Sequence, residues 1–521
     1  MCYALCHEKG IGIMTISGKT YHDITSYDRY RMKGHALDWA NQPAIHKVYP
    51  GMDYQYLPRP ENLPQVSVRH AASPVDTQTR DRAVTVDRLS VILALAYGIT
   101  GRVQAGKKEY FYRGAPSAGA LYPVEVYLAV GGMNGLAAGL YHYDVSGLGL
   151  CRLRSGNIMP FADRCIGLEP DTAPPDLAFF LTGITFRSAW KYMARAFRYL
   201  LLDTGHVLEN LLMSLKAEGL TATVHYNVDR EASNLLMGCD PSRETCFSCV
   251  RIAGGGTSPA GAPGQLSPLP DHVLDAGKVC EKEEVFEEIE QISLASSKPP
   301  TAGKSTAPML ETLGLSPGSW QPMGKAISPS LTDFPTTIVR RRSRRNFVKT
   351  ELPEGAFWGI LDVLSHRSKQ DRPENPPGGS CVSTGILVQN TQGITPGFYV
   401  CDFRKERIGL IRTGDFHTAM AGVCLDQRWL QNTALHFCFM ADLAYLDSTW
   451  GARGYRYAML EAGRLGEAVY LAATAFGLGA CGIGALYDGE AKTLLGLEDT
   501  GALLYLVAAG PVKSDGGFSA L

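Results

Sequence analysis

The sequence contains a long internal repeat at one constant spacing. Residues 138–156 align with residues 396–414, and residues 194–206 align with residues 452–464, both at an offset of 258 positions. The same offset continues without a gap to Gly238. A repeat of about a hundred residues is much longer than the ~20–50 residues of a solenoid unit. It indicates a duplicated domain, and we expect the two copies to pack within one chain like the halves of a homodimer.

The repeat divides the 521 residues into four segments. We expect an N-terminal extension at residues 1–60, a first domain at 61–253, a linker at 254–335 and a second domain at 336–515. The linker is predicted because Gly, Pro, Ser and Ala dominate it, apart from one acidic patch at residues 281–290 that has room for a short helix. The linker would replace the chain break of a true dimer.

Within each copy, the apolar patterns predict both helices and strands. Residues 194–217 and 452–475 carry apolar side chains at helical spacing. Residues 121–130 and 503–510 are apolar runs typical of buried strands. We therefore predict a tandem α+β fold in which helices surround a mixed sheet in each copy, and the copies form an intrachain pseudo-dimer.

The composition excludes several classes of protein. Hydrophobic residues make up 45% of the chain and charged residues 19%, so the chain can bury a core. Lys and Arg (50) balance Asp and Glu (51), and we expect no nucleic-acid or membrane-surface binding, which would need a positive field. No apolar run approaches the ~18 residues of a membrane span. With no signal peptide pattern and 13 scattered cysteines, we expect a cytoplasmic protein without a disulfide framework.

The densest basic cluster is the run of five arginines and one serine at residues 340–345. One interpretation is a solvated loop. The other is a phosphate clamp, because Arg forks and a Ser hydroxyl match phosphate oxygens. We favour the clamp, since such clustering is unusual in a neutral chain.

Other motifs are ambiguous by themselves. Residues 477–482 match G-x-G-x-x-G, but they follow a long helix, whereas a dinucleotide fingerprint follows a strand. A glycine-rich helix exit, or close backbone approach to a flat ring, fits better. Cys246 and Cys249 lack the second pair that structural zinc needs, so we expect no metal site. His206, on a Leu-rich helix, is expected to be a core or interface histidine.

Two further segments have both a structural and a chemical interpretation. Residues 113–127 form a loop of small residues that enters a strand and would permit close ligand approach. Lys191 and Tyr192 are adjacent and precede a long helix. They are either an ordinary helix start or an acid–base pair in which the cation lowers the pKa of the tyrosine.

Taken together, these segments resemble the nitroreductase superfamily. The resemblance rests on residues 341–347 (RRSRRNF), 115–127 (APSAGALYPVEVY), 139–144 (GLYHYD), 191–206 (KYMARAFRYLLLDTGH) and 477–486 (GLGACGIGAL). Within this superfamily, the chain resembles the SagB-type dehydrogenase branch, which includes the azoline oxidases. The resemblance covers both copies.

The resemblance implies that FMN is bound between the two copies. In copy two it assigns the phosphate and ribityl chain to Arg341, Arg342, Ser343 and Arg345, and the flavin ring to Gly482, Ile483 and Gly484. In copy one it assigns a Pro-Ser loop to Pro116, Ser117, Ala118, Gly119 and Ala120. The catalytic Lys-Tyr pair of azoline oxidases matches Lys191 and Tyr192 of copy one.

The corresponding positions in the opposite copies lack these residues. Gly482 and Gly484 correspond to Val224 and Tyr226, Lys191 and Tyr192 to Thr449 and Trp450, Ser343 to Ala71, and the Pro-Ser loop to roughly residues 374–381. One composite site keeps every part, and the other has lost every part. We therefore expect one FMN per chain.

The function implied is an FMN-dependent oxidoreductase that dehydrogenates a peptide-derived or small heterocyclic substrate, such as a thiazoline or oxazoline, to the azole. Tyr192, aided by Lys191, would remove a proton. Oxygen, a nicotinamide or another acceptor would be the redox partner. The alternatives are an NAD(P)H-dependent nitroreductase or quinone reductase of broad specificity, and a flavin-free scaffold or partner subunit. The Lys-Tyr pair favours the dehydrogenase, and further oligomerisation is left open.

Overall fold

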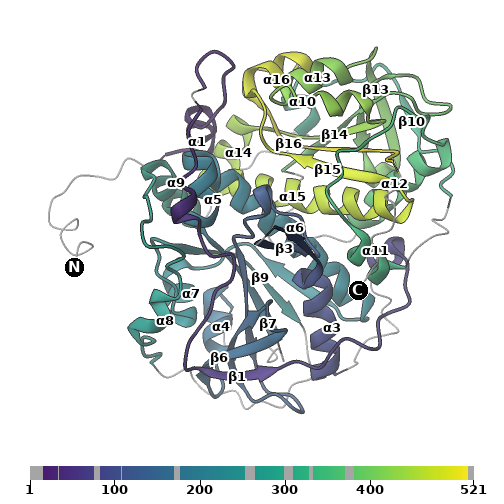
Figure 1. Ribbon diagram of the computed structural model, residues 1–521. Helices are drawn as coiled ribbons and strands as arrows, with labels where there is room; N and C mark the ends of the chain where they lie inside the picture. Colours follow the sequence, from purple (N-terminus) through teal and green to yellow (C-terminus); the bar gives the residue numbers. More distant parts are fainter. Residues whose placement is uncertain are drawn as a thin grey trace.

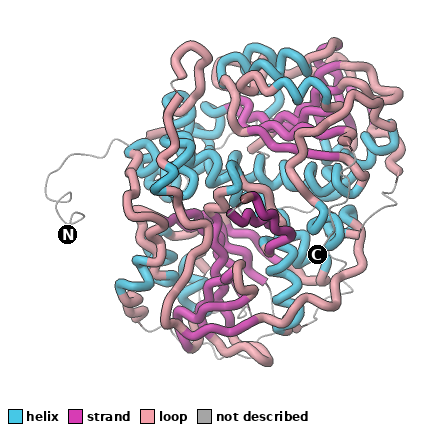
Figure 2. The backbone as a smooth tube through the Cα atoms, viewed as in Figure 1, coloured by secondary structure: helices cyan, strands magenta, loops and turns pink. Residues whose placement is uncertain are grey.

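The computed structural model describes residues 16–32, 34–74, 83–106, 108–168, 177–252, 265–298, 309–327, 333–369 and 381–513. Two seven-stranded sheets lie on either side of a central layer of helices, one sheet in each half of the chain (Figure 1). The tube view in Figure 2 shows the same arrangement, with helices between and around the two sheets. The duplicated α+β fold expected from the repeat is confirmed.

The two sheets have the same strand order. The first runs β1 (Asp53–Tyr56), β6 (Gly149–Ser155), β5 (Gly139–Asp144), β4 (Val124–Val130), β7 (Leu177–Ile184), β9 (Glu244–Ile252) and β8 (Ala222–His225). The second runs β10 (Trp320–Pro322), β13 (Arg407–Thr413), β12 (Gly397–Asp402), β11 (Ser383–Val388), β14 (Leu435–Asp442), β16 (Gly501–Gly510) and β15 (Gly479–Ile483). The strands therefore correspond one to one.

The strands pair antiparallel, whereas we expected sheets that mix parallel and antiparallel pairs. All pairs between the named strands of both sheets are antiparallel. Short turns join β4 to β5 and β5 to β6, and a short turn permits antiparallel pairing only. Parallel pairing is confined to isolated bridges, such as the one between Ser343 and Ala480. That bridge places the arginine segment along the edge strand β15.

The helices repeat as well. The first half contains α2 (Val68–Ala71), α3 (Val86–Tyr97), α4 (Met159–Cys165), α5 (Thr185–Tyr192), α6 (Ala196–Ala217) and α7 (Arg230–Met237). The second half contains α11 (Phe334–Arg340), α12 (Glu354–Ser368), α13 (His417–Val423), α14 (Leu443–Trp450), α15 (Ala452–Ala475) and α16 (Asp488–Leu495). Even a helix end is shared, since α7 and α16 both stop at a left-handed glycine, Gly238 and Gly496.

The two halves meet where α6 crosses α15. A Cβ atom at Gly205 would overlap the carbonyl oxygen of Leu460, and one at Gly463 would overlap that of Leu202. Both pairs are related by the 258-residue offset, so the crossing lies on the pseudo-twofold axis. One contiguous buried hydrophobic cluster includes residues of both halves. Among the described helices, none combines the length and apolar character needed to cross a membrane.

Segments outside the two copies complete the fold. One edge strand of each sheet comes from the segment before the corresponding copy: β1 from the N-terminal extension and β10 from the linker. The expected linker also contains α8 (Asp271–Asp275), α9 (Glu287–Ser297) and α10 (Met309–Thr312), so its described part is more structured than its composition indicates. The N-terminal α1 (Gly18–Ile24) is held by the Asp447 side chain, which accepts from the backbone N–H groups of Gly18 and Lys19.

Candidate functional site

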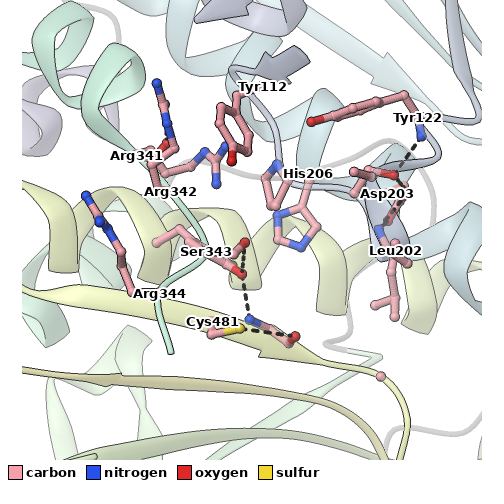
Figure 3. Close-up of a pocket in the computed structure, with 18 of the residues that line it drawn as sticks. Tyr112, Tyr122, Leu202, Asp203, His206, Arg341, Arg342, Ser343, Arg344 and Cys481 are labelled. Atoms are coloured by element: carbon pink, nitrogen blue, oxygen red, sulfur yellow. Dashed lines mark hydrogen bonds between the residues drawn. The ribbon is translucent and has the colours of Figure 1, made fainter. Parts of the chain in front are cut away.

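A cavity of about 1060 Å³ lies between the two halves. Its walls come from the β2 (Ile99–Ala105) and β3 (Lys108–Arg113) hairpin, the loop before β4, helix α6, the arginine segment after α11, and strands β15 and β16 (Figure 3). The residues expected to bind a cofactor all line it: Pro116, Ser117, Ala118, Gly119, Ala120, Arg341, Arg342, Ser343, Arg345, Gly482, Ile483 and Gly484. Tyr192 lines the cavity too. Lys191 is not a lining residue, but its Nζ atom lies next to Gly119 of the lining.

The arginine segment joins the two halves. Arg341 donates from Nε to the carbonyl oxygen of Gly114 (2.7 Å) and from Nη2 to that of Arg113 (2.9 Å). Its third nitrogen, Nη1, is buried and has no hydrogen-bond partner. Arg342 donates from Nη2 to the Thr100 carbonyl on β2 (2.8 Å). These bonds hold the hairpin against the second half and aim guanidinium groups at the cavity.

The positive charge of this wall is not balanced by the protein. Among the described residues, no carboxylate lies within ion-pair distance of Arg341, Arg342 or Arg345. Burial and the charge of Arg341 lower the pKa of Arg342 to about 10. A buried guanidinium nitrogen without an acceptor, such as Nη1 of Arg341, costs free energy that a bound anion would recover. The donor set therefore fits a phosphate group, as the sequence motif predicts.

The small-residue loop is fixed by a buried aspartate that the motif search did not single out. Ser117 donates from Oγ to Asp203 (2.6 Å), and the Ala118 N–H donates to the same carboxyl group (3.2 Å). The Tyr122 N–H in turn donates to Ser117 Oγ (2.9 Å). Burial raises the pKa of Asp203 to about 7, although both hydrogen bonds lower it. The sequence signal that could have identified Asp203 is its charge on an otherwise apolar face of α6.

Lys191 and Tyr192 meet at this loop. A Cβ atom at Gly119, whose φ is +68°, would lie 3.0 Å from the Tyr192 hydroxyl and 3.2 Å from Lys191 Nζ. The expected lowering of the tyrosine pKa is wrong. Burial raises the pKa of Tyr192, and burial together with Arg345 lowers the pKa of Lys191. The reason is that burial of the phenol, together with the neighbouring Tyr199 and Asp203, outweighs the opposing charge of Arg345.

The glycine segment starts as the predicted helix exit, since Gly477 follows the end of α15 with φ +72°, and it then continues into a strand. Gly482 and Ile483 belong to β15, at the sheet edge beside the arginine segment. The Gly482 N–H donates to the Tyr470 hydroxyl (2.6 Å), which also hydrogen-bonds Ser343 Oγ (3.0 Å). The Gly482 N–H is therefore engaged within the protein.

Side chains fill the space where these glycines lack a Cβ. A Cβ atom at Gly482 would overlap the Tyr505 hydroxyl, and one at Gly484 would lie 2.6 Å from the Tyr199 ring. Both tyrosines line the cavity. The glycines thus bring the backbone close to the aromatic wall of the cavity.

The remaining motifs have structural surroundings. Cys246 and Cys249 are buried in β9, and the described residues contain no group of three or more His, Cys, Asp or Glu placed to hold a metal ion. His206 lies at the interface between the halves, as expected. Its Nδ1 is 2.7 Å from Glu467 Oε2 and its Nε2 is 3.0 Å from the Tyr505 hydroxyl. Neither partner was anticipated, because they lie 261 and 299 positions away.

The pseudo-equivalent position across the axis is filled. Glu209 accepts from Arg367 Nε (3.1 Å) and from Arg464 Nε (2.9 Å). Arg464 also donates to the hydroxyl of Tyr226, the residue that corresponds to Gly484 (2.9 Å). Glu461 closes the network through Arg367 (2.8 Å). Paired charges thus occupy the space that is a cavity on the other side. The counterpart of the Pro-Ser loop, at residues 374–380, lies outside the described residues.

Comparisons with known proteins agree with this architecture. The model of the nitroreductase family matches residues 79–254 and 338–511. A protein named as a nitroreductase, MJ1384 of Methanocaldococcus jannaschii, is 29% identical over 176 residues, which are 32% of this chain and 86% of that protein. The trifolitoxin-processing protein TfxB of Rhizobium leguminosarum bv. trifolii is 25% identical over 244 residues, which are 44% of this chain and 64% of TfxB.

A solved structure resembles both halves together. The crystal structure of a nitroreductase-like protein from Anabaena variabilis has a TM-score of 0.75 and 25% identity, covering 95% of this chain and 99% of that one. The family model matches more than half of the chain, in two separate stretches that coincide with the two halves of the fold. The chain therefore belongs to the nitroreductase family and carries two copies of the family's domain.

Proposed function

We propose that the chain is an FMN-dependent oxidoreductase with one composite flavin site, located in the cavity between its halves. The observation that carries the proposal is the wall of unbalanced guanidinium groups, with the unpartnered Nη1 of Arg341, opposite the Asp203-anchored small-residue loop. Arg341, Arg342, Ser343 and Arg345 would hold the phosphate and ribityl chain. The backbone at Gly482–Gly484 would border the ring, and residues 116–120 would cover it.

The reaction we infer is dehydrogenation of a peptide-derived or small heterocyclic substrate of the thiazoline or oxazoline type, as in the SagB-type branch. Similarity to a protein named for trifolitoxin processing supports a peptide-derived substrate. The bound flavin would supply the two-electron acceptor. A nicotinamide-dependent reduction of nitro compounds or quinones is the second candidate, supported by the names of the other relatives.

The residues beside Gly119 would handle the substrate proton. Lys191 is the better acceptor of the two, because burial and the neighbouring Arg345 disfavour its ammonium form. Tyr192 stays protonated, because burial raises its pKa, so its hydroxyl can donate a hydrogen bond to the reacting atom. This division of roles differs from the expectation of a tyrosine base, and it keeps acid and base within one pair.

The test is the flavin content of the purified chain. We expect one FMN per chain, measured as released flavin against protein. Arg345→Ala, an exposed residue of the arginine segment, should weaken FMN binding about 10–100-fold, the loss expected for one charge-assisted hydrogen bond. Arg69→Ala is the matched control from the first half, where Arg69 pairs with Asp362 at the surface. Two flavins per chain, or none after reconstitution, would contradict the proposal.

A further inference from the structure

Three buried side chains form a hydrogen-bonded row that ends at the cavity. Glu467 on α15 bonds to His206 Nδ1 on α6 at 2.7 Å, and His206 Nε2 bonds to the hydroxyl of Tyr505 on β16 at 3.0 Å. The three are 0%, 2% and 6% exposed. Because His206 comes from one half and the other two from the opposite half, the row exists only when the halves are joined.

The hydrogen-bond roles along the row follow from its chemistry. An ionised Glu467 can only accept, so Nδ1 of His206 carries a proton. In the neutral imidazole Nε2 is then an acceptor, and the Tyr505 hydroxyl donates to it. The remaining lone pairs of the Tyr505 oxygen point away from His206. Tyr505 can thus take up a proton from a neighbouring molecule while it passes its own proton to His206.

The end of the row faces the ligand space. Both His206 and Tyr505 line the cavity, and Figure 3 shows the His206 ring between the arginine segment and Asp203. The Tyr505 oxygen lies against Gly482, and a side chain at position 482 would displace this oxygen. The other titratable groups near Tyr505 are Tyr470, Asp203 and Cys481. None of these forms a hydrogen bond with the Tyr505 oxygen, so His206 is its proton partner among the described residues.

The filled position across the axis shows what a purely structural row looks like. At the 258-residue offset, His206 corresponds to Arg464, Tyr505 to Phe247 and Glu467 to Glu209. Glu209 is bonded to two permanent cations, whereas Oε1 of Glu467 is buried without a partner. Glu467 is therefore a carboxylate whose nearest cation would be a protonated His206. The titratable imidazole and the hydroxyl occur only beside the cavity.

We propose that Glu467, His206 and Tyr505 are a proton relay that accepts and returns a proton at the Tyr505 oxygen, beside Gly482. The proton of the bound molecule forms a bond to the Tyr505 oxygen as the phenolic proton moves to His206 Nε2. The imidazolium produced is paired with Glu467, so no phenolate accumulates and charge is conserved. The relay rests on the proposed function, which supplies the two-electron chemistry that such proton transfer accompanies. Tyr505 would be a further catalytic residue besides Lys191 and Tyr192, and His206 and Glu467 would position it.

The first experiment uses the chain without added ligand. Ring nitrogen NMR of the full chain, with His206 assigned by its loss in His206→Gln, should show the Nδ1–H tautomer. Glu467→Gln should change the Nδ1 resonance of that imidazole, since it replaces the carboxylate that accepts the Nδ1–H hydrogen bond. An Nε2–H tautomer, or an imidazole indifferent to Glu467→Gln, would overturn the relay whether or not the chain binds flavin.

The second experiment uses the chain reconstituted with FMN. Tyr505→Phe should keep full flavin occupancy, lower turnover about 10²–10⁴-fold and flatten its pH profile, since it removes the acid–base group. Tyr143→Phe is the matched control, because Tyr143 is buried, lies outside the cavity lining and has an unpartnered hydroxyl. Unchanged turnover in Tyr505→Phe would overturn the relay. Loss of flavin from that variant would overturn it in favour of a role in cofactor binding.

Discussion

The two positions related by the α6–α15 crossing share a backbone and differ in what fills them. On one side, Arg341 and Arg342 line a cavity of about 1060 Å³, and no carboxylate among the described residues forms an ion pair with either of them. On the other, Arg367 and Arg464 are enclosed by Glu209 and Glu461. The strand order, the helix ends and the glycines at the crossing are common to both.

The difference shows how the same scaffold serves two physical purposes. Buried charges are tolerated when each has a partner, and the filled side meets this condition with protein groups alone. The cavity side leaves donors unsatisfied, and an anionic ligand would complete them. A Tyr at position 226, where the cavity side has Gly484, supplies both the volume and a hydroxyl for Arg464. Exchanges of a few side chains thus distinguish an open cavity from a space filled by paired charges.

The largest expected contrast is in turnover. Tyr192→Phe and Lys191→Met should each lower dehydrogenation about 10²–10⁴-fold, the usual contribution of an acid–base group, while FMN remains bound. Trp450→Phe, at the position equivalent to Tyr192, should leave turnover within a factor of about two, because it lies on the filled side. Steady-state rates at saturating substrate measure this. Equal losses in Tyr192→Phe and Trp450→Phe would show that the two sides are not functionally distinct.

The next contrast is in stability. Glu209→Gln should lower the free energy of unfolding by about 3–5 kcal/mol, because two buried guanidinium groups lose their shared carboxylate. Glu467→Gln, the matched change on the cavity side, should cost about 1–3 kcal/mol, since among the described residues Glu467 hydrogen-bonds His206 alone through its side chain. Urea unfolding followed by circular dichroism measures both. If Glu467→Gln were the more damaging variant, the filled side would not be the structural bridge.

A further effect concerns pH and Asp203. Its pKa is raised from 3.8 to about 7 by burial, so the folded state holds a proton that the unfolded state releases above about pH 4. Stability should therefore fall as pH rises from about 4 to 7, by up to about 1.4 kcal/mol per pH unit, and level off above 7. Asp203→Asn should remove this component. Thermal unfolding of both proteins between pH 4 and 8 provides the measurement, and identical pH slopes would exclude Asp203 as the source.

Much of this comparison could be predicted from sequence. The constant offset gave the duplication, and the missing motifs at Val224, Thr449 and Ala71 indicated one site per chain. Pairs such as Asp203 with Ser117, or His206 with Glu467 and Tyr505, could not be found this way, because tertiary contacts between distant segments create them. The Tyr192 pKa was misjudged for the same reason, since burial is a property of the folded chain. The edge strands β1 and β10 lie outside the repeat and left no periodic signal.

The smallest expected effect tests the backbone next to Lys191 and Tyr192, the proposed catalytic pair. Met193 follows Tyr192 with φ 48° and ψ −139°, and Gly451, its equivalent after Trp450, has φ 61° and ψ −158°. Glycine adopts this conformation freely, whereas a residue with a Cβ atom is strained there by about 1–3 kcal/mol. Of these two equivalent positions, only the one on the cavity side is therefore strained, at the end of α5 directly after Lys191 and Tyr192.

Replacing this residue should relieve the strain at little cost to the fold. Met193→Gly should raise the free energy of unfolding by about 1 kcal/mol, because the strain released exceeds the ~0.5–1 kcal/mol of backbone entropy that glycine adds. Gly451→Ala should lower it by about 1–3 kcal/mol, since it creates on the filled side the strain that Met193 carries on the other. If Met193→Gly were stabilising and also reduced turnover, the strained backbone would be a device that positions the Lys-Tyr pair. If Met193→Gly were destabilising, the contacts of the Met193 side chain would contribute more to stability than the backbone strain costs.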